Sequence, residues 1–95
     1  MNHMLTVTQF LLAQCYFAKR AYEKALEYLR QCLIRNRCLP TNARMAMAYC
    51  YFNLNKFEMA KVCAERVLQL EPRCADAFLC LAIVYERAED YTRYF

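Results

Sequence analysis

The chain has 95 residues, of which 60% are apolar, and it contains no glycine and only two prolines. Glycine normally makes up about 7% of a protein. A chain without it cannot readily form phosphate-binding loops or tight β-hairpin turns. The net charge of +4 is too small to indicate a nucleic-acid-binding protein, and the charged fraction of 23% is too ordinary for a disordered one. These values predict a single all-α domain, or a fragment of one, that spans residues 1–95 and has short connections.

Apolar periodicity predicts five helices and the start of a sixth near Asp90; the five cover about residues 4–18, 21–36, 42–54, 57–70 and 75–88. The first stretch carries no charged side chain up to Ala18, which raises the question of a membrane segment. It contains six polar residues, however, and has neither the basic start nor the cleavage site of a secretory signal. We therefore expect an amphipathic helix with a neutral exposed face, and no membrane partner.

A repeat with a spacing of 35 and then 34 residues runs through the chain. Residues 12–16 match residues 47–51, and both match residues 81–85 in their order of small and large apolar side chains. The following segments, 22–25 and 57–60, also match each other. This pattern resembles the tetratricopeptide repeat. The resemblance implies a right-handed solenoid of antiparallel helix pairs with about two and a half repeats, at about residues 6–39, 41–74 and 75–95, the last one incomplete.

The repeat positions predict how the helices pack. Small side chains let paired helices approach closely, and we expect this role for Ala13, Ala25, Ala48, Ala60 and Ala82. Polar Gln9 and Arg44 depart from the pattern, because a large apolar residue is usual there. The turn inside a repeat usually carries a left-handed glycine, and here Asn55 and Arg20 occupy that place. In the third unit, Phe78, Leu81 and Tyr85 would lack half of their cover, so a longer solenoid, a partner or self-association at this end is expected.

The first helix of each pair lines the concave face of such a solenoid, and one stripe of residues is predicted to point into it: Phe10, Gln14, Phe17, Met45, Tyr49, Phe52, Leu79 and Ile83. One interpretation is a groove for a helix or extended peptide with apolar anchors. The alternative is that a neighbouring helix or a second copy buries the stripe. Tetratricopeptide proteins that bind chaperone tails hold a terminal carboxylate with Lys, Asn and Arg at groove positions. That set is missing here, so a charged tail is not the expected partner.

Catalytic and metal-binding residues are not expected. The one histidine, His3, is isolated near the start, the chain has no serine, and no cysteine pair has the spacing of a zinc site. Most of the seven cysteines lie within helical patterns, which favours a role as small apolar core residues in a reducing compartment. We therefore expect no enzyme activity, no cofactor and no metal.

The densest positive cluster comprises Arg30, Arg35, Arg37 and Arg44. A solvated helix face with its turn is one interpretation of this cluster. A weak patch for an acidic partner is the other. Nucleic-acid binding is not favoured, because the net charge is low.

A closer resemblance covers roughly residues 10–90, and its specific part lies in residues 36–61, in one extra residue between repeats and in the turn Leu54-Asn55-Lys56. This run is similar to the large tetratricopeptide subunit of RNA polymerase II-associated factor complexes. The resemblance implies a nuclear scaffold in transcription elongation and chromatin modification, with other complex subunits as partners. The alternative is a general tetratricopeptide adaptor unrelated to transcription, which would then be cytoplasmic.

Overall fold

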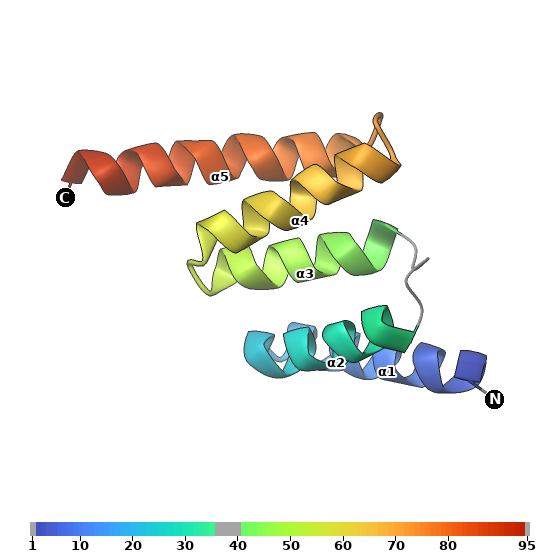
Figure 1. Cartoon of the computed structure of the whole chain (residues 1–95). Coiled ribbons are helices and arrows are strands. Elements are labelled where there is room, and N and C mark those ends of the chain that lie inside the picture. The colour runs from blue at the N-terminus through green and yellow to red at the C-terminus, as the bar shows by residue number, and fades with distance from the viewer. Residues whose placement is uncertain (1, 36–40, 95) are drawn as a thin grey trace.

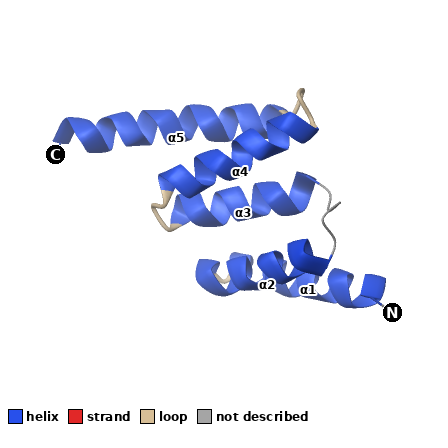
Figure 2. Ribbon diagram, viewed as in Figure 1, coloured by secondary structure: helices blue, strands red, loops and turns tan. Residues whose placement is uncertain are grey.

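The computed structural model describes residues 2–35 and 41–94, which form five helices (Figure 1). They are α1 (Asn2–Ala18), α2 (Tyr22–Arg35), α3 (Thr41–Asn53), α4 (Phe57–Leu70) and α5 (Ala75–Tyr94). The described part of the chain contains helices and connecting turns without a strand (Figure 2). The all-α prediction is therefore confirmed, and the first four helices begin and end within two residues of their expected bounds.

The helices stack in chain order and alternate in direction (Figure 1). α1 packs on α2 and α3 on α4, while α2 joins the two pairs by packing on α3, and α5 packs mainly on α4. The molecule measures 50 × 29 × 18 Å. Each unit thus contacts its neighbours in sequence, as expected of a repeat solenoid.

The turn inside each of the first two units has the same backbone geometry without glycine. Arg20 has φ 63° and Asn55 has φ 62°, so both lie in the left-handed region. In the first turn, the amide of Arg20 donates to the carbonyl of Phe17 at 2.9 Å, and the amide of Ala21 donates to that of Tyr16 at 2.8 Å. In the second turn, Asn55 and Lys56 make the corresponding bonds to the carbonyls of Phe52 and Tyr51, at 3.0 and 2.8 Å. These paired bonds define a Schellman motif, which satisfies the last carbonyls of α1 and α3.

Alanines at repeat positions form the tightest contacts between helices. Ala25, Ala48 and Ala60 are fully buried, and Ala13 is 2% exposed. The fifth expected alanine, Ala82, is exposed, because no described helix lies across α5 in the way that α2 lies across α1 and α4 across α3. Phe78 and Tyr85 are 56% and 53% exposed for the same reason, as predicted.

The cysteines contribute mainly to packing. Cys32, Cys50 and Cys80 are buried, and Cys63 and Cys74 pack against the core. All six described cysteines are free thiols; Cys15 is exposed, and Cys38 lies outside the described residues. Burial raises the pKa of the Cys50 thiol to about 11, so this side chain stays neutral.

The prediction of a helix ending near residue 88 and a sixth helix near Asp90 was wrong, because α5 continues without a break to Tyr94. The residue of the third unit that matches Arg20 and Asn55 is Glu89, which remains helical. A left-handed conformation is unfavourable for residues other than glycine unless packing of the next helix offsets its cost. α5 has neither a glycine nor a proline to end it early.

Candidate functional site: a groove between α1 and α3

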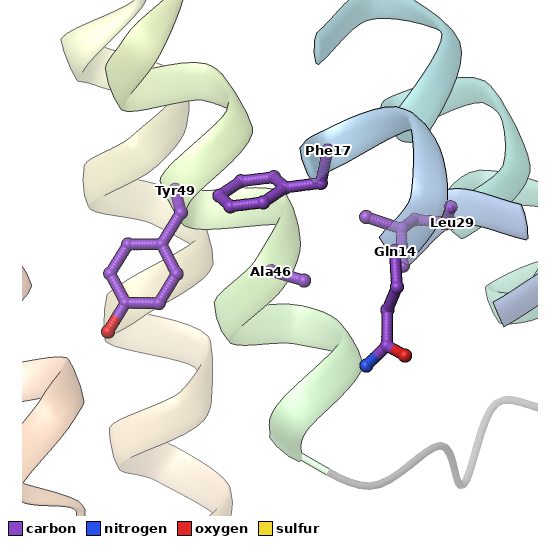
Figure 3. A pocket seen from close by; sticks show the side chains of 6 residues that line it. Gln14, Phe17, Leu29, Ala46 and Tyr49 are labelled. Carbon is purple, nitrogen blue, oxygen red and sulfur yellow. The ribbon is translucent and has the colours of Figure 1, made fainter. Parts of the chain in front are cut away.

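A pocket of about 310 Å³ lies between α1 and α3, the first helices of the first two units (Figure 3). α1 contributes Gln14 and Phe17, and α3 contributes Tyr49. These three residues were predicted from the sequence to face the same groove, and the structure brings them together. The pocket is lined mainly by apolar surface. The Gln14 amide lies on one side of it, and the Tyr49 ring borders the other side with its hydroxyl directed away from Phe17 and Gln14 (Figure 3).

Aromatic contacts fix the orientation of the groove-side rings in both units. Phe17 packs edge-on against Tyr22, with ring centroids 5.4 Å apart and an interplanar angle of 77°. Phe52, which is 35 residues further on, packs in the same way against Phe57 at 5.6 Å and 66°. Each pair joins the last turn of a first helix to the first residue of its second helix. Such pairs stabilise the structure beyond their buried area and limit ring motion.

Tyr49 is the most accessible aromatic side chain of the pocket, with 36% of its surface exposed. Partial burial, together with the nearby charge of Asp76, raises the pKa of its phenol above the ordinary value. The hydroxyl therefore keeps its proton at neutral pH and can donate to a carbonyl of a bound chain. Its ring at the same time offers apolar contact area, a combination that is common at protein interfaces.

The other predicted groove residues do not line this pocket. Phe10 and Phe52 are half-buried and pack against the core. Leu79, at 59% exposed, and the half-buried Ile83 lie on α5, outside the described lining.

The expectation for Met45 was wrong, because it is only 6% exposed and belongs to the core. Ala46 lines the pocket in its place. Consecutive residues of an α-helix lie 100° apart around its axis. A shift of one residue in the expected register therefore exchanges a groove position for a core position.

Sequence reasoning missed three lining residues, Ala13, Leu29 and Ala46. Ala13 was assigned only to the contact between α1 and α2, yet it also lines the pocket. Leu29 comes from α2, a second helix, and the sequence pattern gave no reason to place it in a groove of first helices. The small size of Ala13 and Ala46 was the one available signal, because small side chains leave room for a ligand.

None of the described lining residues is charged. In the part of the chain that the structure describes, no group of three or more His, Cys, Asp and Glu side chains could hold a metal ion. Among the same residues, no helix has the length and apolarity needed to cross a lipid bilayer. The groove between α1 and α3 is therefore characterised by shape, apolar contact and two neutral hydrogen-bonding groups.

The stacked helix pairs, the left-handed turns within them and the groove define a tetratricopeptide-type repeat protein, whose fold serves protein–protein interaction. The family model described as anaphase-promoting complex, cyclosome, subunit 3 matches residues 6–63, more than half of the chain. The chain belongs to this family.

A solved structure of the first tetratricopeptide domain of Spaghetti (RPAP3), bound to the HSP90 peptide SRMEEVD, is similar to this chain. The TM-score is 0.82 and the sequence identity is 28%. The match covers 88% of this chain and 66% of that chain, slightly less than two thirds of its length. The similarity supports the repeat architecture and a peptide as the kind of ligand that such a domain holds.

Proposed function

We propose that this chain is a non-enzymatic interaction module that binds a helix or extended segment of a partner protein in the groove between α1 and α3. The observation that carries this proposal is the convergence of Gln14, Phe17 and Tyr49 from two repeat units on one uncharged pocket. Apolar anchors of a partner would enter the pocket, and the Gln14 amide and Tyr49 hydroxyl would bond to its backbone. Anchors of this kind dominate the binding energy of many interfaces.

The chemistry of the pocket favours an apolar partner over an acidic tail. The peptide bound by the structural neighbour ends in Glu-Glu-Val-Asp and carries three carboxylate side chains. The described lining of this groove offers no Lys or Arg to such groups. Placing carboxylates against uncharged walls would remove them from water without compensation, which is costly.

The first experiment compares two labelled peptides by fluorescence anisotropy. One is an amphipathic helical peptide with Leu and Phe along one face, and the other is SRMEEVD. We expect the amphipathic peptide to bind more tightly, and Tyr49→Ala to weaken its binding about tenfold, as for an interface anchor. Tyr85→Ala is the matched control, because Tyr85 is 53% exposed on α5, away from the pocket.

Three results would refute the groove assignment. They are equal effects of the Tyr49 and Tyr85 variants, tighter binding of SRMEEVD than of the amphipathic peptide, and unchanged binding by an Ala46→Arg variant. The last variant places a long charged side chain in the pocket. Circular dichroism of each variant verifies that helicity is retained.

We further propose that the module works within a larger nuclear assembly. The resemblance of residues 36–61 to the large tetratricopeptide subunit of RNA polymerase II-associated factor complexes supports a role in transcription elongation and chromatin modification. The match of residues 6–63 to anaphase-promoting complex, cyclosome, subunit 3 supports the cyclosome as a second candidate. Affinity capture from native cells with mass spectrometry distinguishes the two. Recovery of polymerase-associated subunits supports the first, recovery of cyclosome subunits supports the second, and purely cytoplasmic partners contradict both.

A further inference from the structure

A second cleft, of about 500 Å³, is lined by three arginines and two aliphatic residues. Arg30 lies on α2 together with Leu33 and Ile34, whereas Arg44 lies on α3 and Arg66 on α4. The cleft therefore spans the junction between the two repeat units. It shares no described lining residue with the groove between α1 and α3. The sequence had placed Arg30 and Arg44 in one positive cluster but gave no sign that Arg66 joins them.

The internal repeat shows what is unusual about two of these arginines. Arg44 and Arg66 occupy the repeat positions of Gln9 and Gln31, which lie 35 residues earlier in each case. In the first unit, Nε2 of Gln9 donates to Oε1 of Gln31 at 2.6 Å, so the two positions face each other across the helix pair. Guanidinium groups only donate hydrogen bonds and cannot replace this pair. The second unit thus places two like charges where the first has a bonded neutral pair.

Contacts inside the cleft leave the charges of Arg30 and Arg66 uncompensated. Arg30 donates to the hydroxyl of Tyr51 at 2.7 Å and lies 5.8 Å from the centre of its ring. Arg66 donates to Oε1 of Gln69 on its own helix at 2.8 Å. Both acceptors are neutral, and the described lining includes no Asp or Glu. These bonds orient the guanidinium groups without neutralising them.

The field of the arginines extends to the neighbouring helix. Burial raises the pKa of the Cys63 thiol on α4, while the charges of Arg44 and Arg30 act in the opposite direction. Two guanidinium groups from different helices therefore act on one side chain at the same junction. This agrees with a concentrated positive potential between the units.

An apolar edge borders the charged part of the cleft. Ile34 is 80% exposed, and Leu33 beside it is half-buried. An aliphatic side chain so open to water next to three arginines offers an anchor point for an apolar residue. Arginine guanidinium groups form bidentate hydrogen bonds with carboxylates. Guanidinium groups beside an aliphatic edge therefore fit a peptide that carries both acidic and aliphatic side chains.

We propose that this cleft is a second docking site, which binds an acidic segment of a partner protein. Carboxylates of the segment pair with Arg30 and Arg66, and an aliphatic side chain of the segment packs on Ile34. The aliphatic edge and the low net charge of +4 favour such a segment over a nucleic acid. With this site, the protein would bind two segments of the same partner: an apolar helix in the groove between α1 and α3, and an acidic segment at the unit junction.

The test uses a fluorescein-labelled peptide in which Glu and Asp flank a central Leu-Leu pair. Its binding to the double variant Arg30→Gln/Arg66→Gln is compared with binding to Arg73→Gln/Arg87→Gln. The two variants lose the same charge, but Arg73 and Arg87 are exposed and lie outside the described lining of the cleft. We expect the first variant to bind about tenfold more weakly than the parent, with little change in the second. Ile34→Ala should weaken binding about threefold, because it removes the aliphatic contact.

Further binding measurements, with other ligands and variants, distinguish an acidic-segment site from the alternatives. A peptide with Gln and Asn in place of Glu and Asp should bind weakly, and added salt should weaken the acidic peptide. Equal losses in the two double variants, or equal binding of the neutral peptide, would overturn the proposal. So would tighter binding of a single-stranded oligonucleotide that depends on the same arginines. If the double variant unfolds, Arg66→Gln alone retains the test, because Arg66 bonds within its own helix. Tyr49→Ala should leave this binding unchanged, so failure here and failure of the groove assignment can be told apart.

Discussion

The contact between α3 and α4 allows a sharp test of the packing, through the substitution Ala48→Leu. Leucine adds three carbon atoms at a position that is 0% exposed. With free space available, their burial would stabilise the fold by about 2 kcal/mol. Because Ala48 is enclosed by the core, the added atoms can enter only by moving the helices apart. We therefore expect a net loss of about 1–3 kcal/mol in the free energy of unfolding.

The internal repeat supplies a matched control for this prediction. Ala82 lies 34 residues after Ala48, at the same repeat position, and it is exposed on α5. Ala82→Leu should change the free energy of unfolding by less than about 0.5 kcal/mol. Thermal denaturation followed by circular dichroism measures both variants, and a loss of 1 kcal/mol lowers the Tm of a domain of this size by about 4–8 °C. A Tm for Ala48→Leu equal to the parent's, or equal losses in both variants, would refute the reasoning.

Three further predictions concern stability. Arg20→Gly should raise the free energy of unfolding by about 0.5–1 kcal/mol in urea titrations, because Arg20 has φ 63° and glycine adopts this conformation without steric cost. Gln9→Met should leave stability unchanged or raise it by up to about 1 kcal/mol, since Oε1 of the buried Gln9 has no hydrogen-bond partner. Stability should fall as the pH rises from about 9 to about 11, because the unfolded chain releases the Cys50 proton near pH 9 and the folded chain holds it to about pH 11. Urea titrations under reducing conditions measure this fall, which should be shallower in Cys50→Ala.

Each of the three can fail in a distinct way. A loss of stability in Arg20→Gly would mean that the arginine side chain makes contacts worth more than the backbone strain. A loss above about 1 kcal/mol in Gln9→Met would show that the bond from Gln9 to Gln31 outweighs the unsatisfied oxygen. A flat stability between pH 9 and 11, or the same slope in Cys50→Ala, would contradict the raised pKa of the Cys50 thiol.

Most of the fold could be predicted because the order of small and large side chains recurs in each repeat and indicates which residues pack between the helices. Residues 12–16 and 47–51 repeat one order of small and large side chains, and Ala13 and Ala48 are both buried in the contacts that this order predicts. The left-handed turn at Asn55 was also predictable, since asparagine tolerates that conformation. α5 was misjudged because the turn of the third unit was expected from the repeat register, although Glu89 itself does not favour one.

The candidate site could be predicted only in part. Periodicity placed Gln14, Phe17 and Tyr49 on one face, and these three line the pocket together. Met45 was misplaced, because the exact rotation of α3 depends on how α2 packs against it. Leu29 could not be found in this way, since it reaches the pocket from α2, and periodicity describes each helix separately.

Local spacing along the chain is enough to predict that this protein is helical, that its helices form pairs, and that Ala13, Ala25, Ala48 and Ala60 lie between them. Which residues from different units meet depends instead on the packing of distant helices, which local spacing does not describe. The three arginines at the unit junction are separated by 14 and 22 residues, and the packing of α2 on α3 brings them to one cleft. The groove between α1 and α3 also takes its lining from both units, so both surfaces proposed for binding depend on how one repeat packs on the next.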